Sequence, residues 1–215
     1  MSHVITPSAP AKDPAGGVRM SLPETLVGYF DEFNWRYHPC FDMCDLDGIL
    51  DVSDCPNLLY LGAYGNGITR LVWPDGGGSL TAVMIDYNPL EAGQGDFSGW
   101  TTLEHLYISN TGEDMGRVNV TGCTALLELY CAYGVWEPAA ALGVDGLDTC
   151  TAIGSVYCEE NGWGADEVDN VLVDLDASGA SSGYATLNGN TPPGAAGLAA
   201  KASLESKGWT VTVDS

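Results

Sequence analysis

The side chains that could do chemistry in this 215-residue sequence are its histidines, cysteines, acids and tyrosines. The three histidines, His3, His38 and His105, are far apart, and no nucleophile-elbow, zinc-protease or phosphate-loop motif is present. His105 beside Glu104, with Glu128 further along, forms the best acid–base candidate. A lone surface histidine does not make a catalytic set. We therefore predict a protein that is not an enzyme and uses no cofactor.

Two clusters near the N-terminus contain residue types that ligate metals. His38, Cys40, Cys44 and Cys55 suit tetrahedral zinc, although the Cys-x3-Cys spacing is loose. A disulfide from Cys44 to Cys40 or Cys55, or simple packing, is the alternative. Aspartates that could supply calcium ligands, without the spacing of an EF-hand loop, are Asp42, Asp45, Asp47, Asp51 and Asp54. We predict no metal at either cluster.

The charge of the chain excludes several classes of partner. It has 7 basic and 29 acidic residues, and Arg117 is the only Lys or Arg between Leu71 and Ala200. Such a chain repels nucleic acid and anionic lipid. No apolar run reaches the ~18 residues of a membrane span, and the N-terminus does not resemble a signal peptide. We expect a chain that is made in the cytoplasm, or one whose leader has been removed, and that inserts into no membrane. Its acids keep it from self-associating, or serve calcium or a cationic partner.

An internal repeat organises most of the chain. The template L-x-x-L-x-L-x-x-N begins at Leu58 and recurs after 22, 23, 23 and 27 residues, and a weaker copy ends at Asn190. Positions 4 and 6, counted from the first leucine, lie on one side of a short strand and position 5 on the other. We predict that position 9, Asn in most copies, turns the chain and bonds backbone groups. The copies must stack to bury their apolar edges. The inward residues at position 4 are Leu61, Val83, Leu106, Leu129 and Val156.

A second half-repeat occurs on the return side of the copies. It reads LDVSDC over Leu50–Cys55 and VNVTGC over Val118–Cys123, with a looser LDTC at Leu147–Cys150. With these motifs the chain resembles the cysteine-containing leucine-rich repeats of bacterial and phage proteins, of the surface-adhesin and internalin type, over roughly residues 46–215. The resemblance implies an α/β fold: a right-handed leucine-rich-repeat solenoid with a parallel sheet on its concave face and a mixed extended and helical convex side. Residues 75–78 and 91–99 are interpreted as insertions.

Tyrosines dominate the outward positions of the predicted strands. Tyr107, Tyr130 and Tyr157 occupy position 5 of successive copies, and parallel strands ~4.8 Å apart would align them as a ladder. Aromatic side chains with polar tips favour binding. The alternative is that tyrosine merely suits a strand surface. The predicted ligand-binding residues on the concave face are Tyr60, Tyr64, Met84, Tyr87, His105, Tyr107, Tyr130, Tyr133 and Tyr157.

Four cysteines fall on inward positions of adjacent copies. Cys131 and Cys158 occupy position 6, while Cys123 and Cys150 share a place on the return side. A disulfide needs Cβ atoms ~3.8 Å apart, which strands ~4.8 Å apart do not readily provide. We therefore predict four reduced, buried thiols that pack as small apolar groups.

Helices are predicted on the return side of the last copies. The first covers residues 165–174 and buries Val168, Val171 and Leu172. The second starts at Thr191-Pro192 and ends at Lys207-Gly208. A strand over residues 209–213 then closes the C-terminus. The predicted buried stripe of the second helix is Ala195, Leu198, Ala199 and Ala202.

Residues 1–45 differ in character from the repeats. Residues 1–22, rich in Pro, Ala and Gly, are predicted to form an extended arm, and residues 23–45 an aromatic cap or a docking surface. Residues 46–215 form the solenoid. The arm carries Lys12 and Arg19 and almost no acid, so we expect it to anchor the chain to other subunits of a larger assembly.

The combination predicts a structural or binding protein on the surface of a bacteriophage virion, as a capsid-decoration or tail component. The solenoid would then present its tyrosine face to a host-surface protein or glycan. The alternative is a leucine-rich-repeat adhesin on a bacterial cell surface.

Overall fold

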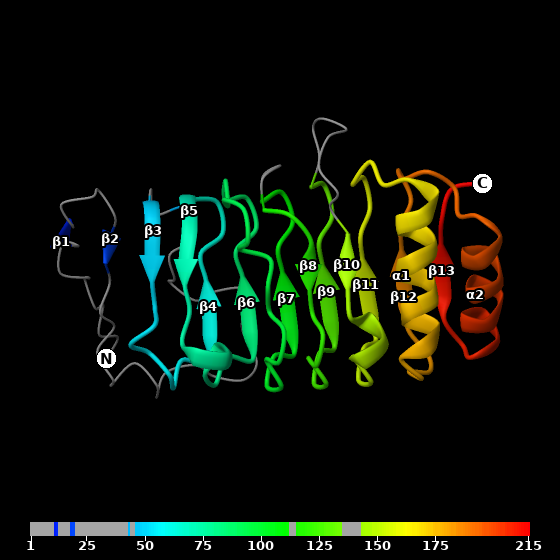
Figure 1. Cartoon of the computed structure of the whole chain (residues 1–215), viewed down its shortest axis with the longest axis horizontal. Helices are drawn as coiled ribbons and strands as arrows, with labels where there is room; N and C mark the ends of the chain where they lie inside the picture. Colours follow the sequence, from blue (N-terminus) through cyan, green and yellow to red (C-terminus); the bar gives the residue numbers. More distant parts are fainter. Residues whose placement is uncertain (1–10, 13–17, 20–42, 44–45, 112–114, 135–142) are drawn as a thin grey trace, which may run out of the picture.

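The computed structural model describes residues 11–12, 18–19, 43, 46–111, 115–134 and 143–215. Within these residues the fold is α/β, with two helices, no closed barrel, and a seven-stranded sheet in which every neighbouring pair is parallel. Figure 1 shows the strands side by side along the long axis of the molecule. Their bounds are β4 (Tyr60–Gly62), β6 (Ala82–Met84), β7 (His105–Tyr107), β9 (Glu128–Tyr130), β11 (Ser155–Tyr157), β12 (Tyr184–Thr186) and β13 (Thr210–Thr212).

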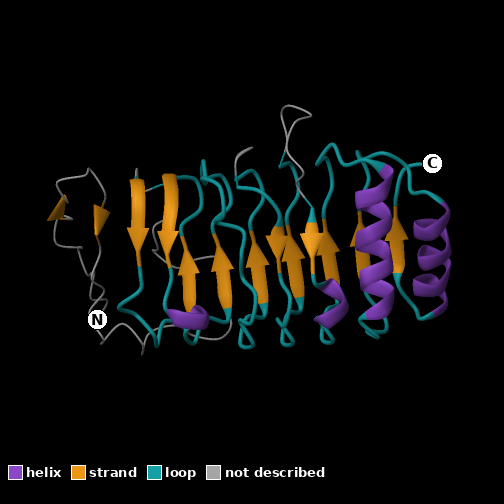
Figure 2. Cartoon of the chain, in the orientation of Figure 1, coloured by secondary structure: helices purple, strands orange, loops and turns teal. Residues whose placement is uncertain are grey.

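A second layer carries the chain back between successive strands of this sheet. Its strands run opposite to those of the seven-stranded sheet, and two helices replace strands toward the C-terminus (Figure 2). Two 3-10 turns, η2 (Asp75–Gly77) and η3 (Leu147–Thr149), lead back to the sheet. The layer contains β3 (Asp47–Asp51), β5 (Gly67–Val72), β8 (Val118–Asn119), β10 (Val144–Asp145), α1 (Ala165–Ala177) and α2 (Ala195–Ser206).

The core lies between the two layers, as the repeat predicts. The register aligns position 4 of every copy in one row across the sheet. Each of the five inward residues predicted at this position is at most 1 % exposed. Alternation with period 2 therefore identified the buried side of each strand correctly. Ala185 and Val211 continue the row in β12 and β13 and are also buried.

Asparagine at position 9 turns the chain after the strands. The Nδ2 of Asn88 donates to the carbonyls of Ala63 and Ile85, and its Oδ1 accepts from the N–H of Ile68. Asn161 and Asn190 make equivalent bonds in later copies. Because these carbonyls and N–H groups are buried where the strand ends, the amide satisfies what the sheet leaves unpaired. The predicted role of this asparagine is confirmed.

The segment at residues 91–99 is not an insertion. Asp96 bridges to Asn119 of β8, and Ser98 N–H donates to Asp96 Oδ1 as Thr121 N–H donates to Asn119 Oδ1. The return motif thus continues through Phe97, with Trp100 where other copies have cysteine. Trp100 fits because Gly77 of the preceding copy has no side chain: a Cβ there would lie 2.3 Å from the indole ring.

The two helices match their predictions unequally. Helix α1 begins at Ala165 and buries Val168, Val171 and Leu172 as predicted, and it runs on to Ala177. Helix α2 begins at Ala195, not at Thr191, because a residue that precedes proline disfavours the helical conformation and Pro192 precedes Pro193.

The predicted buried stripe of α2 is wrong. Its members, Ala195, Leu198, Ala199 and Ala202, are all exposed. The buried residues of α2 are instead Gly197, Ala200 and Leu204. Gly197 meets α1 so closely that a Cβ there would lie 2.2 Å from Oδ1 of Asp169. The close contact with α1 therefore selects the face that carries Gly197.

Only short parts of the N-terminal arm and cap lie within the described residues. Strand β1 (Ala11–Lys12) pairs antiparallel with β2 (Val18–Arg19), and β2 pairs in parallel with β3. Met43 has the positive φ found at the same turn in later copies, and its N–H donates to the carbonyl of Tyr64. The turns of the repeat therefore start before Leu46.

Among the helices that the structure describes, none combines the length and the apolar character that a membrane span requires.

Candidate ligand-binding face

The outward side of the seven-stranded sheet presents two rows of side chains. The register aligns position 5 of each copy in one row and position 3 in another. The position-5 row is Gly62, Met84, Tyr107, Tyr130, Tyr157, Thr186 and Thr212. The position-3 row is Tyr60, Ala82, His105, Glu128, Ser155, Tyr184 and Thr210.

The predicted tyrosine ladder is present in the position-5 row. The ring centroids of Tyr107 and Tyr130 are 4.5 Å apart with planes 11° from parallel. Those of Tyr130 and Tyr157 are 4.1 Å apart at 17°. Because the rings stack face to face, Tyr130 has both of its faces covered. The ladder therefore offers a ligand mainly ring edges and hydroxyl groups.

The hydroxyl groups of Tyr107 and Tyr130 stay protonated. Burial, followed by the hydrogen bond to Glu128, raises the pKa of Tyr107 far above its ordinary value. Burial and a hydrogen bond with Tyr157 raise the pKa of Tyr130 in the same way. These phenols act as hydrogen-bond donors over the whole physiological pH range.

The other predicted aromatic residues form separate groups. The Tyr60 hydroxyl donates to Sδ of Met84, 2.9 Å away, which connects the two rows near the start of the sheet. Tyr64 and Tyr87 form a tilted ring pair with centroids 5.0 Å apart. Tyr133 is 53 % exposed at the turn after β9. The predicted binding residues thus do not form a single cluster.

His105 and Glu128 are brought together as the sequence suggested. The Nδ1 of His105 lies 3.0 Å from Oε2 of Glu128, and the hydroxyl of Tyr107 donates to the same oxygen at 2.7 Å. Both of these partners belong to β7, so this one neighbouring strand holds the carboxylate of β9 in place. Within the described residues, no hydrogen bond to the other oxygen, Oε1, is found.

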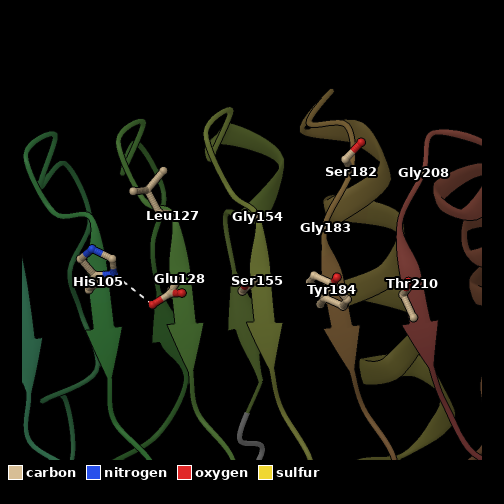
Figure 3. A pocket seen from close by; sticks show the side chains of 10 residues that line it. All are labelled: His105, Leu127, Glu128, Gly154, Ser155, Ser182, Gly183, Tyr184, Gly208 and Thr210. Atoms are coloured by element: carbon tan, nitrogen blue, oxygen red, sulfur yellow. Dashed lines mark hydrogen bonds and ion pairs between the residues drawn. The ribbon is translucent and has the colours of Figure 1, made fainter. Parts of the chain in front are cut away.

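A shallow groove of about 390 Å³ crosses this side of the sheet beyond Glu128. From His105 and Glu128 it runs across Gly154 and Ser155 to Tyr184, and on to Thr210 of the next strand (Figure 3). The described residues that line it are His105, Leu127, Glu128, Gly154, Ser155, Ser182, Gly183, Tyr184, Gly208 and Thr210.

Sequence reasoning missed most of this groove. Tyr184 is 59 % exposed and belongs to the weak copy that ends at Asn190, where it takes the same position as Tyr60. The repeat position of Tyr184 was therefore the signal that could have identified it as an outward-facing residue. The serines and glycines of the lining carry no signal in the sequence, because they matter here only for the space that they leave.

The metal-binding alternatives receive no support within the described part of the chain, where no group of three or more His, Cys, Asp or Glu side chains could hold a metal ion. His38, Cys40, Cys44, Asp42 and Asp45 lie outside the described residues.

Cys123, Cys131, Cys150 and Cys158 are buried free thiols, as predicted, and Cys55 is a half-buried free thiol. The redox states of Cys40 and Cys44 remain predictions, because neither residue is described.

Comparisons of the chain with protein-family models, with curated proteins and with solved structures found no match.

Proposed function

We propose that this chain is a non-enzymatic binding protein, a right-handed leucine-rich-repeat solenoid that presents the outward side of its sheet to a ligand on a host surface. The observation that carries the proposal is the pair of ordered rows. Tyr107, Tyr130 and Tyr157 stack in one, while Glu128 is held by two donors in the other. A rigid surface of aromatic and polar groups loses little entropy on binding.

The proposed setting is the surface of a bacteriophage virion, with a bacterial cell-surface adhesin as the alternative. A net charge of −22 suits a protein that projects from a particle and must not adhere to its own copies. The arm, residues 1–22, would anchor the chain to other subunits. The described parts of the arm, β1 and β2, add to the sheet that contains β3. The proposed anchoring therefore concerns the remaining residues of the arm.

Binding to whole bacterial cells tests the presentation of the face. Fluorescently labelled protein is mixed with a panel of bacterial species, and bound label is measured by flow cytometry. The double variant Tyr87→Ala/Tyr133→Ala removes two exposed rings from the face and is expected to reduce binding at least tenfold. The matched control, Val173→Ala/Leu198→Ala, removes exposed apolar groups from α1 and α2 and should bind as the unaltered protein does. Equal loss in both variants, or no binding to any species, would contradict the proposal.

Deletion of residues 1–22 tests the anchor. In lysates of the native source, the full chain is expected to sediment with particles and the truncated chain to stay in the supernatant. Co-sedimentation of both chains would rule out the anchor, and recovery of the full chain with the cell envelope would favour the adhesin.

A further inference from the structure

The position-3 row contains a gap the width of one ring. Ser155 pairs with Glu128 on one neighbouring strand and with Tyr184 on the other. Two strand spacings therefore separate Glu128 from Tyr184, which is about 9.6 Å between their Cα atoms. In the adjacent row, where the three consecutive strands β7, β9 and β11 each carry a tyrosine, the ring centroids follow one another at 4.5 and 4.1 Å. The side chain of Ser155 is too small to fill the space that one aromatic ring would occupy between Glu128 and Tyr184.

We propose that this gap, the groove over Ser155, binds one pyranose unit of a neutral or amino-sugar glycan. The inference rests on the proposed function, and it names the class of ligand and the subsite. Tyr184 would stack on the sugar, and Glu128 would bind its hydroxyl or amino groups.

Tyr184 has a ring face available for stacking, unlike Tyr130, whose two faces are covered by its neighbours in the ladder. Its neighbours in the row are Ser155 and Thr210, and among the described residues no other aromatic ring contacts it. The side chain is 59 % exposed. The C–H groups on one side of a pyranose ring carry partial positive charge and pack against the negative face of an aromatic ring.

Glu128 is oriented to accept hydrogen bonds from a ligand in the gap. Its Oε2 is held at 3.0 Å by His105 and at 2.7 Å by Tyr107. Its Oε1 receives no such bond from the described residues. An ionised carboxylate oxygen accepts two hydrogen bonds, so Oε1 can take two sugar hydroxyls or an ammonium group. The hydroxyls of Ser155, Ser182 and Thr210 supply further donors and acceptors along the lining.

The charge of the groove decides which sugars fit. Among the described residues that line it, Glu128 carries the one carboxylate, His105 is already bonded to that carboxylate, and none is a lysine or arginine. A sialic or uronic acid would bring a second carboxylate to Glu128 without a cation to balance it. Neutral and amino sugars do not meet this repulsion.

Two glycines that line the groove, Gly154 and Gly183, differ in whether they can accept a side chain. A Cβ at Gly183 would lie 2.5 Å from the carbonyl of Gly154 and 2.6 Å from the Trp209 ring, so this position requires glycine. A Cβ at Gly154 would meet only the carbonyl of Leu127, at 3.8 Å, which is ordinary contact. The substitution Gly154→Leu can therefore place a side chain in the groove without straining the backbone.

Saturation-transfer NMR with methyl pyranosides tests the proposal. The probes are the methyl glycosides of glucose, galactose, mannose, N-acetylglucosamine and glucosamine, with methyl glucuronide as the anionic counterpart. At least one neutral or amino sugar is expected to receive saturation, and the glucuronide none. Tyr184→Ala and Gly154→Leu should each weaken that binding at least tenfold, Tyr184→Phe should retain it, and Leu198→Ala on α2 should leave it unchanged. Circular dichroism checks that each variant is folded.

Several outcomes would overturn the inference: no pyranoside binds, binding persists in folded Tyr184→Ala and Gly154→Leu proteins, or N-acetyltyrosinamide occupies the groove instead. Attachment to cells that depends on Tyr87 and Tyr133, without pyranoside binding, removes this inference and leaves the proposed function standing. Pyranoside binding that Tyr184→Ala abolishes, without attachment to any cell, supports the subsite and removes the proposed function.

Discussion

The sulfur atoms of Cys131 and Cys158 lie 3.0 Å apart in the core, where one thiol donates a hydrogen bond to the other. They occupy the same position in adjacent copies, next to β9 and β11. Cys123 and Cys150 have no such partner and donate to backbone carbonyls, those of Phe97 and Val120. These four buried thiols are therefore all hydrogen bonded.

We predict that these four thiols resist alkylation in the folded protein at pH 8. Burial raises the pKa of Cys123 to about 11 and that of Cys150 to about 12, so neither supplies the thiolate that reacts. Mass spectrometry of labelled peptides before and after denaturation measures this, with half-buried Cys55 as the reactive control. Cys158→Ser should lower the free energy of unfolding by about 1–3 kcal/mol through a poorly satisfied buried hydroxyl. Rapid native labelling of all four cysteines would contradict the prediction.

Asn161→Ala should destabilise the protein more than Thr111→Ala, the corresponding change in a copy that has threonine at the same repeat position. The Asn161 amide bonds the carbonyls of Cys131 and Cys158 and accepts from the N–H of Gly134. Its removal leaves three buried backbone groups without this hydrogen-bond partner. We therefore expect a loss of at least about 2 kcal/mol in the free energy of unfolding. Thr111 occupies the same repeat position but its hydroxyl bonds one carbonyl, that of Ile108. Urea unfolding compares the two variants, and equal losses would refute the role assigned to the asparagine.

Arg117→Met should destabilise the protein at neutral pH and do so less in acid. Arg117 forms two hydrogen bonds with Asp145, at 2.8 and 2.7 Å, and a third with Glu167 at 2.8 Å. The bonds from Arg117 hold the pKa of Asp145 below its usual 3.8. A depressed folded-state pKa means that this stabilisation is complete above pH 3.8 and is lost as pH falls through the lower folded-state value.

The expected loss at pH 7 is about 1 kcal/mol, because the pair is partly exposed. Unfolding of both proteins is measured from pH 7 to pH 2.5. The two stability curves should converge below pH 3.8. The control, Lys201→Met, breaks the ion pair with Glu205 within α2 and should cost less. A constant difference down to pH 2.5 would show that Arg117 stabilises by packing alone.

Much of the fold could be predicted from local periodicity. Leu61, Val83 and their equivalents alternate with outward residues, and alternation is a property of one strand that needs no knowledge of its neighbours. The same holds for α1, where Val168, Val171 and Leu172 are the apolar residues of an otherwise acidic stretch. Helix α2 is rich in alanine all round, so period alone could not select its buried face. Contact with α1 decided that face, through Gly197 and Leu204.

The candidate site, like the fold, was determined partly by the sequence and partly by the tertiary structure. The sequence by itself determined which residues point outward, and so it placed Tyr107, Tyr130 and Tyr157 in one ladder. The repeat also assigns Glu128, Ser155 and Tyr184 to position 3 of successive copies, but only the tertiary structure decided that their side chains leave a groove between them. The physical reason is that a groove is defined by side chains that are absent. Its shape depends on the register between strands, and hydrogen bonds across the sheet set that register.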